Sequence, residues 1–192
     1  MNSLALSLQP APFETPTAFA SRLAARNGVE NVTTFCLELG LDLRAIANGD
    51  TCAVTELCSI AGLAPDALAT ATERCFSKTR YQVCSENFDR QTLKRTNIRV
   101  CPECLREQHR HSTDIWDKIH MFIWKIPQVM CCPLHDERLI EIVEPTHGLE
   151  RFDTTQAIQS AWTRIQSEHN RESANRFEKY LYSRLYKGRG TA

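Results

Sequence analysis

Two short motifs of cysteine, proline and histidine carry the clearest chemistry in the sequence. One is CPEC at positions 101–104 and the other is CPLH at positions 132–135, with 27 residues between them. A two-residue spacer lets both ligand side chains of such a knuckle converge on one ion, and two knuckles complete a tetrahedron. Three sulfur ligands and an imidazole favour Zn²⁺ over the hard cations Mg²⁺ and Ca²⁺. The spacing therefore predicts one structural zinc ion, with the ligands Cys101, Cys104, Cys132 and His135.

The neighbouring Cys131 leaves a choice of ligand in the second knuckle. Only Cys132 has the two-residue spacing to His135, so we assign the ligand role to Cys132 and a packing role to Cys131. Four protein ligands fill the coordination shell and leave no position for a substrate, which argues against a catalytic zinc. Because metal binding and folding are coupled at such sites, we expect region 101–135 to unfold without metal.

The cysteine count and the N-terminus bear on the class of protein. Nine cysteines in 192 residues are an odd number, and no basic segment precedes the short apolar patch at the N-terminus. Both observations favour a cytoplasmic protein with reduced thiols over a secreted one with a disulfide framework. No stretch approaches the ~20 apolar residues of a membrane-spanning helix. The sequence shows no Cys–His–acid set and no glycine-rich phosphate loop, so we expect neither an enzyme nor a small-molecule substrate.

The formal net charge of zero is a cancellation between segments. Residues 1–73 have a net charge of −5, residues 74–130 have +5, and residues 131–192 are balanced. Basic side chains alternate with aromatic ones between positions 74 and 100, a pattern that suits a phosphate backbone. A solvated connecting segment with ordinary surface charge explains the pattern equally well. The candidate nucleic-acid-binding residues are Arg74, Lys78, Arg80, Arg90, Lys94, Arg95 and Arg99.

The elements that would position these residues are mostly helices. We expect a mainly α fold with a helical, helix-turn-helix-like domain at 10–90, a small structural zinc-finger module at 91–145 and a C-terminal helical segment at 152–188. The first helix should begin at Pro16, with Thr15 as its cap, and end at Gly28. A second helix should run from the cap Asn31 to Gly40.

Residues 51–73 have the spacing of a helix-turn-helix. An apolar stripe that includes Val54 and Leu57 precedes a turn at Gly62, and Pro65 would open a second helix. That helix would present Asp66 and two threonines rather than the Arg, Lys, Asn or Gln side chains that usually read bases. A role in packing or in partner binding is therefore favoured for this segment over DNA recognition.

Two further apolar patterns indicate how the rest of the chain packs. The interior of the zinc finger is too apolar for a free loop and should form a small core; its residues are Ile115, Trp116, Ile119, Phe122, Ile123, Trp124 and Ile126. A helix should begin near Thr155 and bury a stripe from Ile158 to Ile165. The basic, aromatic segment 176–187 should pack on the domain or on a partner, with nucleic-acid contact as the alternative.

Three stretches of the chain resemble the TniQ family. Residues 12–28, with RLAARNG at their end, are similar to the opening helix of the family, and VCPECL at 100–105 matches its first zinc knuckle. The third stretch starts at Ile115 and ends in WKIPQVMCCPLH at 124–135. Asp136 stands where the family usually has glycine. No cysteine follows Cys132, so the second finger of many members is absent.

The resemblance implies zinc ligands at the same four positions, a helix-turn-helix segment near the N-terminus and a non-enzymatic adaptor role in DNA transposition. Such adaptors contact target DNA or a nucleoprotein complex and help to recruit an AAA+ ATPase and a transposase. A stand-alone zinc-containing helix-turn-helix regulator is the alternative function.

Overall fold

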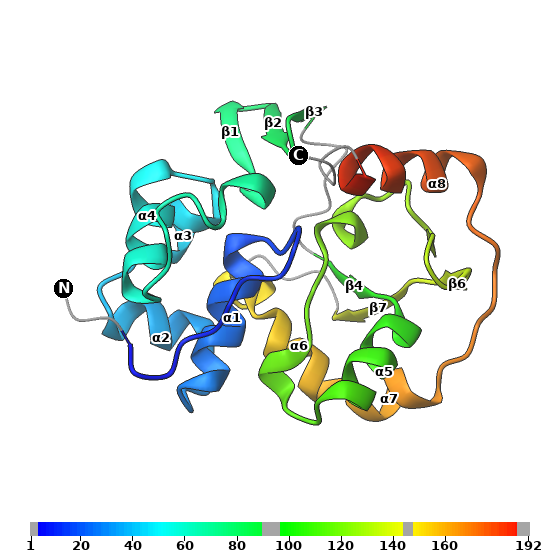
Figure 1. The fold of residues 1–192 in the computed structure, drawn as a ribbon, viewed down its shortest axis with the longest axis horizontal. Coiled ribbons are helices and arrows are strands. Elements are labelled where there is room, and N and C mark those ends of the chain that lie inside the picture. The colour runs from blue at the N-terminus through cyan, green and yellow to red at the C-terminus, as the bar shows by residue number, and fades with distance from the viewer. Residues whose placement is uncertain (1–3, 90–96, 144–147, 188–192) are drawn as a thin grey trace.

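The computed structural model describes residues 4–89, 97–143 and 148–187. Helices dominate these residues, as the sequence predicts, but short strands occur between Arg74 and Val143 (Figure 1). The α-helices are Pro16–Arg26 (α1), Val32–Glu38 (α2), Leu43–Ala47 (α3), Thr51–Ile60 (α4), Pro102–His111 (α5), Thr154–Ser160 (α6), Trp162–Ser167 (α7) and Arg176–Tyr182 (α8). A π-helical turn, Ser183–Lys187, extends α8.

The strands form three small antiparallel sheets among the described residues. Their bounds are Arg74–Ser77 (β1), Arg80–Val83 (β2), Glu86–Asp89 (β3), Ile98–Val100 (β4), Cys131–Cys132 (β5), Glu137–Arg138 (β6) and Ile140–Val143 (β7). The first sheet has the order β1-β2-β3, and the other two are the pairs β4-β7 and β5-β6. Figure 1 shows the three-stranded sheet at one edge of the molecule, between α4 and α8.

The predicted ends of the first two helices are confirmed. The Thr15 hydroxyl accepts a hydrogen bond from the Ala18 N–H at 3.3 Å, and the Asn31 side chain accepts one from the Thr34 N–H at 2.8 Å. Gly28 follows α1 in the left-handed conformation that a helix end requires, with φ of 73°. The short helix α3 was not predicted, because five residues are too few to show the apolar periodicity of a helix.

The predicted second helix of a helix-turn-helix is wrong. Helix α4 ends before Gly62 as expected, but the chain from Pro65 makes turns and then one 3-10 turn, Ala69–Ala71. The Thr72 hydroxyl donates to the Leu68 carbonyl at 2.7 Å, and β1 begins two residues later at Arg74. This segment turns the chain from α4 into β1 instead of forming an α-helix.

Two hydrophobic clusters organise the fold. The first cluster, which we call the helical cluster, is formed by α1 to α4 together with Phe152. The second, which we call the metal-side cluster, surrounds the two knuckles and also takes Tyr81 from β2, Ile158 and Ile165 from the C-terminal helices, and Leu185. The core of the predicted finger is therefore shared with strands and helices far away in sequence.

The predicted finger core is confirmed in part. Phe122, Ile123, Trp124 and Ile126 are fully buried, whereas Ile115, Trp116 and Ile119 are only partly buried. The Trp116 ring instead lies 5.0 Å from the guanidinium of Arg26 on α1. The C-terminal helix starts at Thr154, as expected, but an extended segment separates α7 from α8.

A buried aspartate joins the two clusters. Asp153 accepts hydrogen bonds from the Ser21 hydroxyl on α1 at 2.6 Å and from the Val32 N–H of α2 at 2.8 Å. It also caps α6 by accepting from the Gln156 N–H. Three helices therefore meet at this one carboxylate.

Among the described residues, no helix has both the length and the apolar character needed to cross a membrane.

Candidate metal centre

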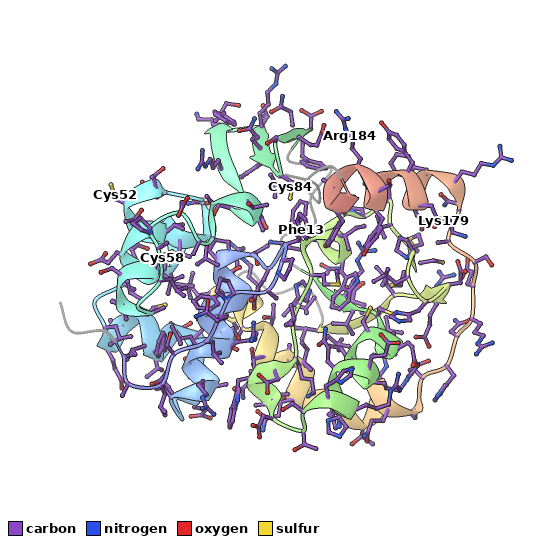
Figure 2. The ribbon with its side chains drawn as sticks, in the orientation of Figure 1. Phe13, Cys52, Cys58, Cys84, Lys179 and Arg184 are labelled. Atoms are coloured by element: carbon purple, nitrogen blue, oxygen red, sulfur yellow. The ribbon has the colours of Figure 1, made fainter. Side chains whose placement is uncertain are left out.

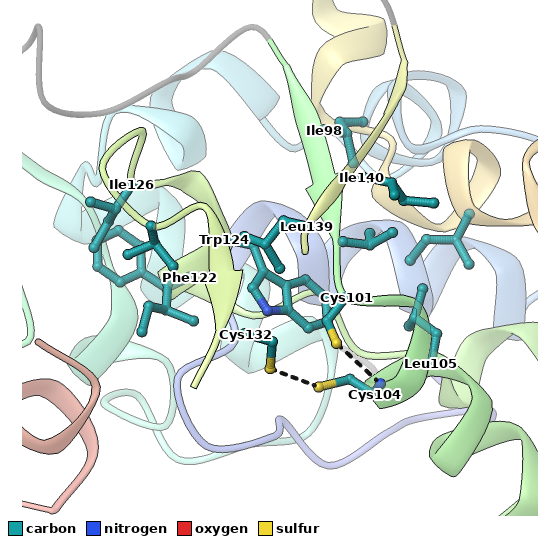
Figure 3. Packing of buried hydrophobic residues seen from close by; sticks show 14 of the residues in the cluster. Ile98, Cys101, Cys104, Leu105, Phe122, Trp124, Ile126, Cys132, Leu139 and Ile140 are labelled. Carbon is teal, nitrogen blue, oxygen red and sulfur yellow. Dashed lines mark hydrogen bonds between the residues drawn. The ribbon is translucent and has the colours of Figure 1, made fainter. Parts of the chain in front are cut away.

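The two knuckles meet because one begins a helix and the other forms a hairpin. Cys101 is the N-cap of α5, with Pro102 at the first helical position, so Cys104 lies one turn into the helix on the same side. Cys132 ends β5, and His135 follows in the turn to β6. Figure 3 shows the sulfur atoms of the three cysteines at the rim of the metal-side cluster, next to Trp124 and Leu105.

The separations between the ligand atoms fit a tetrahedral ion. Bond lengths of about 2.3 Å to sulfur and 2.0–2.1 Å to nitrogen require S···S edges of about 3.8 Å and S···N edges of about 3.5 Å. The Cys104 and Cys132 sulfurs lie 3.7 Å apart, and His135 Nδ1 lies 3.7, 3.2 and 3.7 Å from the sulfurs of Cys101, Cys104 and Cys132. All four ligand atoms lie within 4.8 Å of one another, so these residues can bind one metal ion.

The electrostatics of the cluster also call for a cation. Hydrogen bonds with Cys101 and Cys132 raise the pKa of the Cys104 thiol far above its usual range. Hydrogen bonds from Cys101 and Cys104 lower the pKa of Cys132 to about 2. Without a metal, the buried cluster therefore favours one thiolate held by protonated neighbours, and three thiolates together require a divalent cation.

Charged groups around the ligands fix their positions, and sequence reasoning missed them. His135 Nε2 pairs with the Glu107 carboxylate of α5 at 2.9 Å, which directs Nδ1 toward the sulfurs. Glu137 is buried, and its Oε2 lies 3.8 Å from the Cys101 sulfur and accepts from the Glu103 N–H at 2.8 Å. The i+3 spacing of Glu107 from Cys104 on one helix is the only signal that could have identified this partner.

An arginine connects this surrounding shell to the C-terminal helices. Arg106 donates to both oxygens of Glu137, at 2.9 and 3.2 Å, and to Glu103 at 2.8 Å. It also donates to the backbone carbonyls of Ile165 and Glu168, at 3.0 and 2.6 Å. Ile165 lies in α7 and Glu168 caps its C-terminal end. The two hydrogen bonds therefore connect the residues around the candidate ligands to a helix that follows both knuckles in sequence.

The other cysteines lie away from the cluster. Cys131 is buried next to Cys132, but its backbone N–H donates to Glu178 and its sulfur does not join the four ligand atoms. Burial, followed by the nearby Glu178, raises the pKa of this thiol to about 11. Figure 2 shows Cys52 and Cys58 on α4, in the opposite half of the molecule. All nine cysteines are free thiols.

Asp136 shows why this position of the family pattern usually carries glycine. Its φ of 46° lies in the left-handed region, where a non-glycine residue is strained. Here the carboxylate compensates, because Oδ1 accepts from the Ala174 N–H at 2.9 Å and pairs with Lys179 at 3.4 Å. The hairpin that carries His135 is thereby fastened to the start of α8.

The candidate nucleic-acid-binding residues differ in position and in exposure. Arg74, Lys78 and Arg80 are exposed on β1, on β2 and in the turn between them. Arg99 is buried, and its guanidinium donates to the carbonyls of Val129 and Ile126, so this side chain belongs to the core and we exclude it from the candidate surface. Arg90, Lys94 and Arg95 lie outside the described residues.

Comparisons with known proteins place the chain in a family. The TniQ family model matches residues 5–139, which include α1 to α5, the first sheet and all four candidate ligands. A comparison with curated proteins gives no match. The family match extends over more than two thirds of the chain. The chain therefore belongs to the TniQ family, which has a role in transposition.

Proposed function

We propose that this protein is an adaptor in DNA transposition that contacts DNA or a nucleoprotein complex and recruits the AAA+ ATPase and the transposase to the target site. The observation that carries the proposal is the family match, because it spans both the helical cluster and the knuckles. The role needs no chemistry of its own. It needs a rigid body with separate surfaces for DNA and for proteins.

The metal in this proposal is Zn²⁺, with a structural role. Cys101, Cys104, Cys132 and His135 would hold it, and the four ligands leave no coordination position for a substrate or an activated water. When bound, the ion supplies folding free energy and fastens α5 to the β5-β6 hairpin. This closed ligand set supports an adaptor rather than a zinc enzyme. We also propose a cytoplasmic location.

The proposed DNA contact uses Arg74, Lys78 and Arg80. All three are exposed, and within the part of the chain that the structure describes none of their side chains takes part in an ion pair. Exposed cationic side chains on a sheet whose other face packs on the core can neutralise phosphates. Such contacts weaken as the salt concentration rises. The alternative of a stand-alone helix-turn-helix regulator has less support, because the segment from Pro65 contains no recognition helix.

A pull-down with the AAA+ ATPase encoded by a neighbouring gene, with and without duplex DNA, tests the adaptor role. We expect the tagged protein to retain the ATPase and the DNA in one complex. The variant with Arg74, Lys78 and Arg80 all changed to Ala should lose DNA and keep the ATPase, whereas the control Arg164→Ala, on exposed α7, should keep both. Retention of neither partner at low salt by the zinc-loaded wild type would refute the proposal.

A further inference from the structure

The three-stranded sheet has one buried face and one open face. Tyr81 and Val83 of β2 point into the metal-side cluster, and Phe88 of β3 meets Phe122 edge to face, with ring centroids 5.8 Å apart. Side chains alternate along a strand, so the residues between these point the other way. Arg80 and Asn87 on that outer face are exposed and Gln82 is partly exposed. No other described element packs over them as part of the cluster.

The strand register places three hydrogen-bonding side chains in one row across the outer face. Arg74 of β1 is the partner of Gln82 on β2, and Gln82 is the partner of Asn87 on β3. Directly opposed side chains on one face lie about 4.5–5.5 Å apart at Cβ. Arg74, Gln82 and Asn87 therefore form a short continuous ridge.

This ridge has no partner inside the protein. Within residues 4–89, 97–143 and 148–187, the side chains of Arg74, Gln82 and Asn87 make no hydrogen bond and no ion pair. Arg74 and Gln82 also line a hollow of about 230 Å³, together with the hydroxyl-bearing residues Thr70, Thr72 and Ser85. The donors and acceptors of the ridge thus face solvent, where a ligand can reach them.

The side-chain types of the ridge match the edges of DNA bases. Arginine forms paired hydrogen bonds with guanine in the major groove, and asparagine and glutamine do so with adenine. Three strands spaced 4.7–4.9 Å apart are about 10 Å wide, which fits a major groove of about 12 Å. Lys78 and Arg80 both lie at the β1-β2 turn, on one side of the ridge, where they are placed to contact phosphates; Arg80 is the register partner of the exposed Asp89.

A single-stranded ligand fits this face less well. Binding of single strands depends on a series of aromatic rings on which bases stack. Tyr81 turns inward and the partly exposed Phe88 packs on Phe122. Phe76, with 64% of its surface accessible, is the one largely exposed aromatic ring of the sheet, and it lines a second hollow with Phe88, Arg80, Asn87 and Asp89. The outer face therefore offers hydrogen bonds to base edges rather than a stacking platform.

From these observations we infer that the outer face of the β1-β2-β3 sheet enters the major groove of duplex DNA, with Arg74, Gln82 and Asn87 toward the bases. The inference rests on the DNA contact in the proposed function and specifies its surface. The sheet takes the place of the recognition helix that the chain lacks after Gly62.

The test is a fluorescence-anisotropy titration of the zinc-loaded full chain with a labelled mixed-sequence duplex at several salt concentrations. The variant with Gln82→Ala and Asn87→Ala should bind at least about 10-fold more weakly with an unchanged salt dependence, because base contacts release no counterions. Lys78→Ala should instead lower the slope of log affinity against log salt by about 1. Gln159→Ala, an exposed glutamine on α6, is the matched control and should change neither quantity.

Groove access gives the second readout. Duplexes methylated at guanine N7, which lies in the major groove, should bind the wild type more weakly than unmodified duplexes. Two results would overturn the sheet assignment and leave the adaptor role standing. The first is that the variant with Gln82→Ala and Asn87→Ala binds the duplex as tightly as the wild type, and the second is that methylation does not weaken binding by the wild type. Tighter binding to the single strand than to the duplex would also overturn it. Absence of any DNA binding by the wild type would remove both the sheet assignment and the proposed DNA contact.

Discussion

The helical cluster and the metal-side cluster are stabilised in different ways. In the helical cluster, the buried residues of α2, α3 and α4 are all apolar, whereas α1 also buries Thr17, Ser21 and Arg22, and Arg22 pairs with the buried Glu14 at 2.6 Å. The metal-side cluster contains strands of only two to four residues and several buried charged or titratable groups, among them Arg99, Lys118, His120 and Glu137. Burial of apolar surface is enough for the first. We propose that the second also depends on fixed polar partners and on a metal cross-link through the four candidate ligands.

The largest expected effect is the loss of the metal ligands. Cys104→Ser should abolish zinc binding and destabilise the metal-side cluster severely, because structural zinc contributes an apparent ~10–16 kcal/mol in small zinc domains. Cys131→Ser is the matched control, since this buried cysteine lies beside the site without joining it. Thermal melting and elemental analysis of both variants measure the difference. Equal melting temperatures and zinc contents would contradict the assignment.

The contact between the clusters should be next in size. Asp153→Ala removes hydrogen bonds to the Ser21 hydroxyl, the Val32 N–H and the Gln156 N–H. We expect a loss of about 3 kcal/mol in the free energy of unfolding, because buried donors lose their acceptor and α6 loses its cap. Urea denaturation measures this loss. Asp66→Ala, an exposed aspartate in the turn after α4, should change stability by less than about 0.5 kcal/mol. Similar losses in the two variants would show that Asp153 does not join the clusters.

Acid should weaken the metal-side cluster through His120. Burial, with a smaller contribution from Lys125, lowers the pKa of His120 to about 3, against 6.5 for the ordinary side chain. A lowered folded pKa favours the neutral ring, so its stability contribution is complete above about pH 6.5 and is lost as the pH falls toward 3. The loss from this residue is about 2 kcal/mol at about pH 5.

The variant His120→Gln separates this titration from that of the metal ligands. Glutamine does not titrate, and its amide can replace the donation of Nε2 to the Arg99 carbonyl, which spans 3.1 Å. Chemical denaturation of both zinc-loaded proteins between about pH 7 and pH 5 should give a shallower decline for the variant. Parallel declines would mean that folding does not lower the pKa of His120.

The smallest expected difference is between two glycine variants, and it concerns the attachment of the three-stranded sheet to the helical cluster. Gly49 has a φ of 71°, and a Cβ built there would lie 2.4 Å from the Glu73 carbonyl oxygen, just before β1. Gly28 has a similar φ of 73° and open space around it. Both changes to Ala should cost about 1 kcal/mol in backbone strain, and Gly49→Ala should cost about 1–2 kcal/mol more because β1 must shift. Comparison of the two midpoints in urea tests this, and equal midpoints would argue against the close approach.

Features that depend on local spacing could be predicted from the sequence. The helix caps Thr15 and Asn31 act on backbone groups within three residues, and the two-residue spacers of the knuckles fix each ligand pair. The choice of Cys132 over Cys131 followed from spacing in the same way, and the four ligand atoms gather as that choice requires.

Features that depend on packing between distant segments could not be predicted. Arg99 looked like a surface cation, but its partners are carbonyls at positions 126 and 129. The strands β1 to β3 are short, and their inner face is defined only by a core that also contains Leu185. Pro65 and the alanines after it have helical character, but tertiary contacts of this segment, such as the hydrogen bond from the Cys84 N–H to the Thr70 carbonyl, hold it as turns.

The contrast between the two clusters is tested most directly by amide hydrogen exchange of the full chain, measured by mass spectrometry with zinc bound and after chelation. We predict that chelation removes protection from α5, β4 to β7 and α8, while α1 and α4 keep most of theirs. Figure 1 shows these two sets of elements on opposite sides of the molecule. Unchanged protection around the four ligands after complete zinc removal would contradict the claim that the metal holds this half of the protein together.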